Sequence, residues 1–508
     1  MITGQAQQTA NHTGSADHWP LAVAAIAEAA LPEFLLRQRW YPAKDAGLPE
    51  VKLAVLEPFA DAESPSAIAL WEVTPPGQET LCVFVPLTLT ASGARCLDRI
   101  ASMPGEGGTA ALAIVDAIKV DSFVHAWVAT IRGSSGRRLR PGHTAYLADT
   151  GLADTGWSIR RGKVEQSNTS MRVGEQAILK FIRTVEAGIH PEVEVGRFFA
   201  EHKDFAATAR LLGWVELAGE STETTTLSIL QAYAPNRGDG WRWVVERLGE
   251  GMQGRAKPLD ETIVWLRRLG TRMAEMHKAF AVPSDDPSFA PEPVTKEDVQ
   301  GWAAEARTRA WRALDALMAR REQLAPTAKD IADRLTARRD RLVSEMDRLT
   351  PRPGSFSKTR HHGDFHLGQV LVTGDDAVII DFEGEPMRPL AERRAKHAPL
   401  RDVAGLLRSL SYAAATAARD LPKDAIARRA ELSAWEGRAS EAFCDAYLAA
   451  MKGVASLPSC ASESQRMVRF FKLEKAFYEI AYELANRPDW VEVPMRGVLE
   501  MIGEDSKS

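Results

Sequence analysis

Two short motifs in the second half of the chain carry the residue types that phosphoryl transfer requires. Residues 361–369 read HHGDFHLGQ, and residues 379–386 read IIDFEGEP after an apolar, strand-like run. They place Asp364 five positions before Gln369 and ahead of Asp381. Transfer of the γ-phosphoryl group of ATP needs a carboxylate facing the attacking hydroxyl, and oxygen ligands for Mg²⁺. We therefore predict a kinase with Asp364 as catalytic base and Gln369 and Asp381 as Mg²⁺ ligands. The alternative, a turn aspartate that caps a helix, does not account for the spacing.

A lysine upstream of these motifs fits the nucleotide side of the same reaction. Lys180 ends an apolar run at 177–179, and a helical stretch with Glu192 and Glu194 follows. In kinase N-lobes a strand lysine binds the α- and β-phosphates and is held by a helix glutamate. Glu194 is the preferred partner and Glu192 the second choice. The preceding polar run is expected to form a turn over the phosphates: Ser167, Asn168, Thr169 and Ser170. The alternative for Lys180 is an edge-strand charge.

A helical pattern near the C-terminus separates polar from apolar side chains. At about 100° per residue one face carries Lys475, Tyr478, Glu479, Tyr482 and Asn486, and the opposite face carries Leu473, Phe477, Ile480 and Leu484. Tyrosines offer a ring face and a hydroxyl, which suits sugar recognition. An amphipathic surface helix with two half-buried tyrosines is the alternative from the pattern alone.

Composition excludes several other classes of protein. With 508 residues, 45% hydrophobic and 26% charged, the chain is typical of a globular protein with two or three domains. A net charge of −5 gives no general attraction to nucleic acid or anionic lipid. The four cysteines form no CxxC pair, which favours a cytoplasmic protein without a zinc site. No apolar run approaches the ~20 residues that span a membrane.

The order of patterns along the chain predicts the fold class. Residues 1–16 read as a disordered lead-in, and residues 17–105 as an N-terminal cap subdomain that opens with a helix at 21–36 and ends near a Gly-rich stretch at 104–108. Residues 106–235 form a β-rich N-lobe and intermediate subdomain, with strands expected at 123–131, 177–181 and 224–230. Residues 236–508 form a helical C-lobe, with helices expected at 259–280, as a pair across 296–349 broken near Pro326, and between 401 and 485. The prediction is an α+β, bilobal fold like that of eukaryotic protein kinases.

Three further features are assigned structural roles. Residues 249–254 match GxGxxG but follow a helical segment, so we expect a loop and no dinucleotide site. Asp402 is expected to hydrogen-bond the catalytic loop from beneath. His277 is expected to be a helix histidine and not a metal ligand.

These motifs together resemble the maltokinases, in the aminoglycoside-phosphotransferase-like branch of the kinase fold. The resemblance runs through residues 165–170, 179–181, 191–198, 235–241, 362–408, 473–479 and 487–490. It continues more weakly to 38–41, where such kinases have a cap over the N-lobe, while residues 105–158 match poorly.

The resemblance implies phosphorylation of maltose by ATP at the anomeric hydroxyl, giving maltose 1-phosphate for α-glucan and glycogen synthesis from trehalose. It implies that Gln231, Ala232 and Tyr233 lie in the hinge that meets adenine. It implies a sugar pocket lined by His366, Lys475, Tyr478 and Tyr482. Trehalose synthase would be a separate partner protein. Two alternatives stay open: a kinase for glucosamine or another monosaccharide, and a weakly active kinase-like sugar-binding partner of trehalose synthase.

Overall fold

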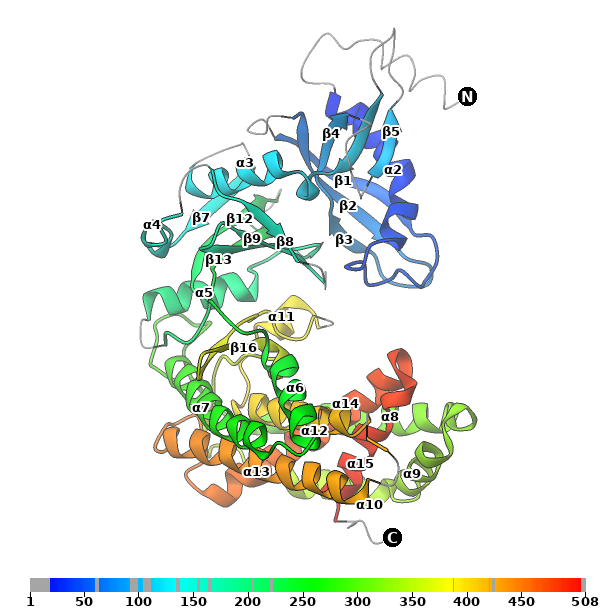
Figure 1. Ribbon diagram of the computed structural model, residues 1–508, viewed down its shortest axis with the longest axis vertical. Helices are drawn as coiled ribbons and strands as arrows, with labels where there is room; N and C mark the ends of the chain where they lie inside the picture. The colour runs from blue at the N-terminus through cyan, green and yellow to red at the C-terminus, as the bar shows by residue number, and fades with distance from the viewer. Residues whose placement is uncertain are drawn as a thin grey trace. The chain divides into compact units, whose positions relative to one another are not determined.

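The chain folds into two compact units in the computed structural model (Figure 1). The N-terminal unit comprises residues 1–201 and 210–233, and the C-terminal unit comprises residues 202–209 and 234–508. The structure describes residues 19–59, 64–91, 99–103, 111–133, 138–152, 156–162, 167–202, 205–219, 223–386, 388–419, 421–422 and 425–503. The predicted lead-in at 1–16 and the Gly-rich stretch at 104–108 lie outside these residues.

Two antiparallel sheets dominate the N-terminal unit. The first has seven strands in the order β11-β3-β2-β4-β6-β5, with β1 also paired to β2. The second has six strands in the order β7-β12-β13-β10-β9-β8. The strands are β1 (Glu50–Phe59), β2 (Ser66–Thr74), β3 (Leu81–Phe84), β4 (Leu87–Ala91), β5 (Arg99–Met103), β6 (Leu112–Asp116), β7 (Leu139–His143), β8 (Ile159–Arg161), β9 (Thr169–Val173), β10 (Ala177–Phe181), β11 (Thr184–Val185), β12 (Leu211–Ala218) and β13 (Thr224–Ala232). The helical segments are α2 (Trp19–Leu36), η1 (Ala117–Lys119), α3 (Asp121–Arg132), α4 (Tyr146–Asp149) and α5 (Pro191–Glu201).

Alternation along β2 separates two hydrophobic cores. Successive strand residues point to opposite faces of a sheet. Ile68 therefore joins the core that contains α3 and the second sheet, whereas Ala69 and Trp71 join the core covered by α2. The first sheet is buried on both faces. Its strands extend past residue 105, to Asp116 in β6 and to Val185 in the edge strand β11.

One predicted strand of this unit is a helix. Residues 123–131 lie in α3, and among these nine residues only His125 and Ala129 are not buried. Because Ala129 is apolar although it is exposed, the sequence of this segment shows little of the 3.6-residue period and resembles a strand. Asp121 in the first turn and Arg132 in the last turn complement the helix dipole. The indole of Trp127 donates to Ser228 Oγ at 2.7 Å, which fixes α3 against the second sheet.

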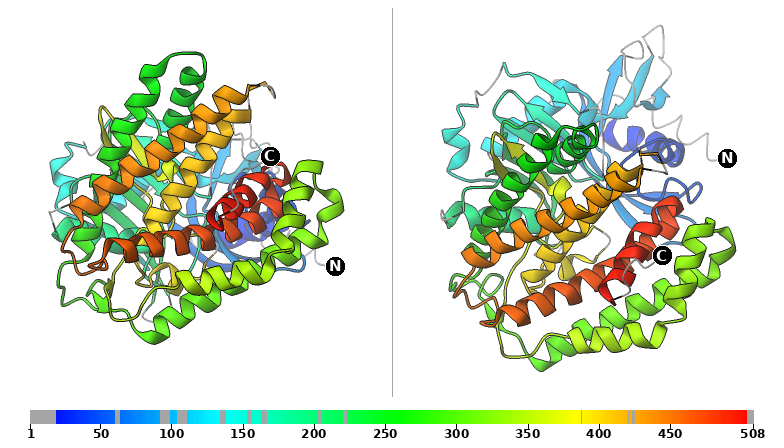
Figure 2. Two further views of the ribbon diagram at one scale, coloured as in Figure 1. Left: turned by 90° about the horizontal axis from the view of Figure 1, so that it is seen from below. Right: turned by 60° about the horizontal axis from the view of Figure 1, so that its bottom comes forward.

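Helices make up most of the C-terminal unit, and Figure 2 shows α13 and α14 running along it. Its helical segments are α6 (Gly240–Met252), α7 (Ala256–Phe280), α8 (Lys296–Ala319), η2 (Arg321–Gln323), α9 (Pro326–Thr336), α10 (Arg339–Leu349), η3 (Leu367–Gln369), α11 (Leu390–Arg393), α12 (Leu400–Arg419), α13 (Ile426–Ala450), α14 (Ala461–Asn486), η4 (Pro488–Trp490) and α15 (Glu492–Met501). Its strands form two antiparallel pairs: β14 (Glu292–Pro293) with β15 (Ser357–Lys358), which are far apart in sequence, and the hairpin of β16 (Val370–Thr373) with β17 (Asp376–Ile379).

The predicted helix at 259–280 is confirmed as α7, which packs along α13. The predicted pair across 296–349 is three α-helices, because the chain breaks a second time at 337–338 without a glycine or proline to mark it. Residues 249–254 were predicted to form a loop, but the first four of them belong to α6, which ends at Met252. No helix in the described part of the chain is long and apolar enough to cross a membrane.

Candidate active site

The short hairpin of β16 and β17 brings Gln369 and Asp381 together. Val370 pairs with Ile379, and Gly374 adopts φ +68° in the turn that joins the strands. Gln369 directly precedes β16, and Asp381 follows β17 by two residues. The Gln369 side-chain amide donates to Asp381 Oδ2 at 2.8 Å. Two residues twelve positions apart thus present an amide and a carboxylate side by side.

The backbone of Asp381 has a conformation that L-residues rarely adopt. Its φ is +70°, the one positive value for a non-glycine residue among those described. Such positions are sparsely populated because Cβ crowds the backbone, although aspartate tolerates them better than most residues. Strain of this kind concentrates at functional sites. The geometry is consistent with a carboxylate that the chain aims in a fixed direction.

Asp402 on α12 holds the catalytic loop by its backbone, as predicted. Its two carboxylate oxygens accept from the backbone N–H of His362 at 2.7 Å and of Gly363 at 3.0 Å. Gly363 has φ +88°. Gly405 lets α12 approach closely, because a Cβ there would lie 2.6 Å from the Phe365 carbonyl oxygen. The loop that carries Asp364 is therefore fixed from the helix below it.

His277 extends this support into the core. It is fully buried, with Nε2 3.0 Å from Asp402 Oδ2 and Nδ1 2.8 Å from the Tyr447 hydroxyl. Burial raises the pKa of Asp402, but the hydrogen bond to His277 and the neighbouring imidazoles lower it by more. The pKa of Asp402 is therefore well below its usual range. The carboxylate that holds the loop is therefore ionised. His277 is a structural residue, in agreement with its expected role.

The two histidines beside Asp364 are oriented by hydrogen bonds to the backbone. His362 Nδ1 accepts from the Asp364 N–H at 3.4 Å, so Nε2 carries the proton that it donates to the Ile380 carbonyl at 2.9 Å. His366 Nδ1 accepts from the Gly368 N–H, and its Nε2 lies 3.9 Å from Asp364 Oδ2. Burial lowers the pKa of His366. The predicted His366 thus lies beside the predicted base.

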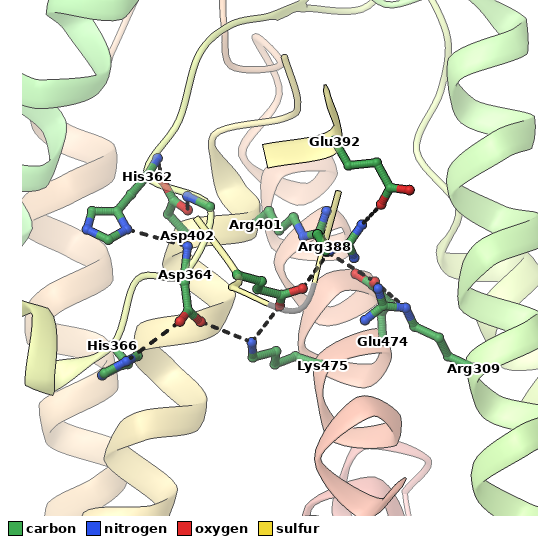
Figure 3. A network of polar contacts seen from close by, with 12 residues as sticks. Arg309, His362, Asp364, His366, Arg388, Glu392, Arg401, Asp402, Glu474 and Lys475 are labelled. Atoms are coloured by element: carbon green, nitrogen blue, oxygen red, sulfur yellow. Dashed lines mark hydrogen bonds and ion pairs between the residues drawn. The ribbon is translucent and has the colours of Figure 1, made fainter. Parts of the chain in front are cut away.

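Lys475 lies between Asp364 and a glutamate that the sequence analysis did not assign (Figure 3). Its Nζ is 2.8 Å from Glu385 Oε1 and 3.5 Å from Asp364 Oδ1. Burial lowers the pKa of Lys475, but Glu385 and Asp364 raise it more, so the net shift is upward. An ammonium group fixed beside the base carboxylate restricts where that carboxylate points.

Glu385 belongs to a longer chain of charges, of which Figure 3 labels Lys475, Arg388 and Glu392. Arg388 Nε donates to Glu385 Oε2 at 2.6 Å, and its two terminal nitrogens reach Glu392 at 3.0 Å and Glu305 at 2.9 Å. Arg309 then binds Glu305 at 2.7 Å. Opposite charges therefore alternate from Asp364 to α8. Glu385 and Arg388 follow Asp381 closely, so their position was a usable signal that we did not interpret.

The two tyrosines of α14 lie next to Lys475, in agreement with the helical pattern. Lys475 Nζ is 4.7 Å from the centroid of the Tyr478 ring, which stacks on Tyr482 at 6.3 Å. Tyr482 is 44% exposed. Glu479 differs from the pattern, because it is buried and bound to Arg408 of α12 at 2.7 Å. The polar face is narrower than predicted, and its carboxylate belongs to the core.

In the N-terminal unit Lys180 pairs with Glu192, the second choice of the sequence analysis. Lys180 Nζ is 2.9 Å from Glu192 Oε2, and the Gln231 amide donates to Glu192 Oε1 at 3.1 Å. Glu192 and Glu194 both lie in the first turn of α5 and are buried. Side chains two positions apart on a helix point in directions that differ by about 200°, so Glu192 and Glu194 face different sides of α5. The orientation of α5 therefore places Glu192, and not Glu194, beside Lys180. We correct the assigned partner accordingly.

The polar run at 167–170 divides between two environments. Thr169 is buried and its hydroxyl accepts from Arg183 Nε at 2.8 Å, while Asn168 Oδ1 accepts from the Arg183 N–H at 3.3 Å. Ser170 is exposed and pairs in register with Lys180. The Thr169 side chain therefore faces the core, so any contact of this residue with the phosphates would come from its backbone. The assignment of Ser167, Asn168, Thr169 and Ser170 to the phosphates stays a prediction.

The predicted hinge residues lie at the end of β13: Gln231 and Ala232 are its last two residues, and Tyr233 follows it. The Tyr233 N–H donates to the Gln176 carbonyl at 2.7 Å, and the Ala232 N–H to the Arg210 carbonyl at 2.8 Å. The guanidinium of Arg172 lies 3.7 Å over the Tyr233 ring. The side-chain amide of Gln231 donates to Glu192, so the predicted contact of Gln231 with adenine would be made by its backbone.

Comparison with known proteins places the chain in a family. The model of the phosphotransferase enzyme family matches residues 158–443, more than half of the chain. Glucosamine kinase of Streptacidiphilus jiangxiensis is 28% identical over 68% of this chain and 73% of its own length. Glucosamine kinase of Mycolicibacterium smegmatis is 27% identical over 68% of this chain and 80% of its own length.

Solved structures confirm the predicted kinase-like fold. A glucosamine kinase crystal form has a TM-score of 0.67 at 22% identity, covering 94% of this chain and 99% of that chain. The complex of glucosamine kinase with glucosamine, ADP and inorganic phosphate has a TM-score of 0.64 at 22% identity, covering 94% and 98%. The resemblance is therefore confirmed at the level of the family and not at the level of maltokinase. The chain is an enzyme that belongs to the phosphotransferase enzyme family.

Proposed function

We propose that this protein transfers the γ-phosphoryl group of ATP to a hydroxyl of a sugar. The observation that carries the proposal is the placement of Asp364, on a loop fixed by Asp402 and beside the ammonium of Lys475. The Asp364 carboxylate accepts the hydroxyl proton as that oxygen forms its bond to phosphorus, while the bond from phosphorus to the ADP oxygen breaks. Such transfer depends on positioning and charge stabilisation, which a fixed loop supplies.

Gln369 and Asp381 fit a divalent cation. Their amide and carboxylate lie side by side, and a hard cation such as Mg²⁺ prefers oxygen ligands. Because Gln369 donates through its nitrogen, the amide oxygen is left to coordinate. The bound ion would neutralise charge that develops on the phosphates. Lys180, held by Glu192, is proposed to bind the α- and β-phosphates from the N-terminal unit.

Glucosamine is the first acceptor to test. Two relatives named glucosamine kinase align with about two thirds of this chain. One structure of similar fold contains glucosamine together with ADP and phosphate. These similarities support an amino sugar as the acceptor.

Maltose is the second acceptor, favoured by the α14 residues. Lys475, Tyr478 and Tyr482 form a continuous stack of an ammonium and two rings, which suits a sugar with more than one ring. Its product would be maltose 1-phosphate, available for α-glucan synthesis, and trehalose synthase would then be a partner enzyme.

The test is ADP release with Mg²⁺ and ATP against glucosamine, maltose, glucose and no sugar, with the product identified by phosphorus NMR. Sugar-dependent turnover of glucosamine supports the first acceptor, and an anomeric phosphate on maltose supports the second. No turnover with any sugar would overturn the proposal and leave a kinase-like binding protein as the function to pursue.

A further inference from the structure

Arg183 is a fully buried arginine at the point where the chain passes between the two sheets of the N-terminal unit. It lies between β10 of the second sheet and β11, the edge strand of the first sheet. Its side chain pairs with that of Asp116, and both are 0% exposed. Arginine is almost never fully buried unless it is paired. Apolar residues often stabilise a core as well as a buried ion pair does, so stability alone does not explain this arginine.

The three nitrogens of the Arg183 guanidinium bind three different strands. Nη2 donates to Asp116 Oδ2 of β6 at 2.5 Å, and Nη1 donates to the Phe84 carbonyl of β3 at 3.2 Å. Both strands belong to the first sheet. Nε donates to the hydroxyl of Thr169, at the start of β9 in the second sheet, at 2.8 Å. Because a guanidinium is planar and rigid, it holds these three groups at fixed positions relative to one another.

The backbone of Arg183 and a ring of the first core strengthen the same connection. The Arg183 N–H donates to Asn168 Oδ1 at 3.3 Å, and its carbonyl accepts from the Phe84 N–H at 2.8 Å. The Trp40 ring, in the core covered by α2, has its centroid 4.7 Å from the guanidinium carbon, within the range of a cation–π contact. Arg183 therefore holds two consecutive residues of the run 167–170 against the first sheet.

The predicted phosphate contacts lie beside the residues that Arg183 holds. Ser170 follows Thr169 directly and pairs in register with Lys180 on β10. Lys180 precedes Arg183 by three residues in the chain. The strand that carries the lysine and the polar run therefore share one anchor. An error of about 1 Å in groups that position a substrate is enough to lower activity about 10²-fold.

We propose that Arg183 is a positioning residue for the nucleotide, which fixes Lys180 and the run 167–170 at the places that the first sheet sets. The inference rests on the proposed kinase function, because it takes the phosphates to bind at these residues. Arg183 acts through them and not by direct contact, since its own side chain is fully buried. The first sheet, whose strands carry none of the predicted site residues, thereby takes part in nucleotide affinity.

Thr169→Val tests the link to the polar run, and Ser228→Ala is its matched control. Both side chains are buried, and both residues are direct cross-strand neighbours of Phe181. The Thr169 hydroxyl accepts from Arg183 Nε at 2.8 Å. The Ser228 hydroxyl accepts from the Trp127 indole at 2.7 Å. Each substitution therefore removes the acceptor of one buried N–H at the same level of the sheet, and only the first affects Arg183.

Nucleotide binding and turnover are measured separately. Calorimetry with Mg²⁺ and a non-hydrolysable ATP analogue, without sugar, gives dissociation constants, and ADP release gives kcat and both KM values. Thr169→Val should raise the dissociation constant and the KM for ATP about tenfold, the low end for a hydrogen bond to a charged group. Its kcat and its KM for the sugar should stay within about threefold, and Ser228→Ala should leave every value within about twofold. Equal nucleotide affinity of the two variants would overturn the proposal.

Arg183→Met, alone and combined with Asp116→Asn, separates positioning from stability. The single variant leaves a buried carboxylate unpaired, which is strongly destabilising, whereas the double variant leaves no buried charge. Thermal melts should therefore show that the double variant is the more stable of the two. The dissociation constant of the analogue should remain about tenfold above the wild-type value in both. Recovery of nucleotide affinity together with stability would overturn the proposal. If these variants fail to fold, the comparison of Thr169→Val with Ser228→Ala decides.

The wild-type protein separates this proposal from the kinase function. If the wild type does not bind the analogue, both are overturned together. If it binds and the variants differ as expected, but no sugar is turned over, the positioning role is supported and the kinase function is overturned. If sugars are turned over but Thr169→Val and Ser228→Ala bind the analogue equally, only the positioning role is overturned.

Discussion

Lys180 and Lys475 are both lysines within 3 Å of a glutamate oxygen, but their surroundings differ. Lys180 meets Glu192, twelve residues later, across a strand and the next helix. Lys475 meets Glu385 from ninety residues away, and Glu385 is itself held by Arg388. The first pair lies within the N-terminal unit, where Glu192 also accepts from the Gln231 amide of β13. The second belongs to a network, so a change at one member should alter the others, including the base.

The largest effect should come from the base at the end of that network. Asp364→Asn should lower kcat by about 10²–10⁴-fold, the contribution of a positioned general base. The affinity for ATP should stay within about twofold, because only the group facing the hydroxyl changes. Stopped-flow binding of a fluorescent ATP analogue and steady-state ADP release measure the two quantities. Near-normal turnover would mean that Asp364 is not the base.

Replacing each lysine by methionine tests the contrast directly. Lys475→Met should lower kcat about 10- to 100-fold, which corresponds to the ~1.5–3 kcal/mol of a hydrogen bond to a charged group. Lys180→Met should instead raise the KM for ATP by a similar factor. Full kinetics with both substrates varied distinguish the two outcomes. If both variants changed the same kinetic parameter, the assignment of different roles to the two lysines would fail.

Glu385→Gln should change the pH dependence of stability. Burial raises the pKa of Glu385, but Lys475, Arg401 and Arg388 lower it by a larger amount, so the pKa lies well below its usual range. A carboxylate with a depressed folded-state pKa contributes stability above its unfolded pKa of ~4.3 and loses it as pH falls further. The wild type should therefore be about 1.5–3 kcal/mol more stable than the variant at pH 7.

Thermal melts of both proteins between pH 7 and pH 3 measure this difference. The gap should narrow as the pH falls below about 4.3, where the unfolded carboxyl takes up its proton. A gap that stays constant over this range would show that Glu385 is not held ionised by its neighbours.

The smallest effect should be that of Tyr482→Ala. Tyr482 is 44% exposed, so the free energy of unfolding should change by no more than about 0.5 kcal/mol. The KM for the sugar should rise a few-fold, since the ring stacks on Tyr478, while the KM for ATP is unchanged. A selective rise in the KM for ATP would remove α14 from the sugar site.

The sequence predicted best what is local in the chain. Gln369 and Asp381 meet because a four-residue strand pair joins them, and that hairpin is legible in the apolar run at 377–380. The choice between Glu192 and Glu194 was not accessible in the same way. It depends on how α5 is rotated against β10, which is a property of packing.

Two other misses have physical causes of the same kind. Segment 123–131 was predicted as a strand because seven of its nine residues are buried and Ala129, on the exposed side of α3, is apolar. A cavity beside Asp364 combines Trp302 and Glu305 with residues more than fifty positions later, which no spacing in the sequence connects.

The trehalose-linked pathway and the predicted domain boundaries stay predictions.

The hydrogen bonds from Tyr447 through His277 to Asp402 mean that α13 and α7 take part in setting the shape of the catalytic loop. Tyr447 is fully buried and remote in sequence from every motif discussed above. In a saturation library scored for growth, Tyr447→Phe should therefore resemble an active-site lesion, even though one hydroxyl is lost and the ring still packs. Substitutions at His277 and Tyr447, inside the helical core, should therefore reduce turnover as substitutions at the active site do. Inhibitors or stabilising substitutions directed to this part of the core would also change turnover.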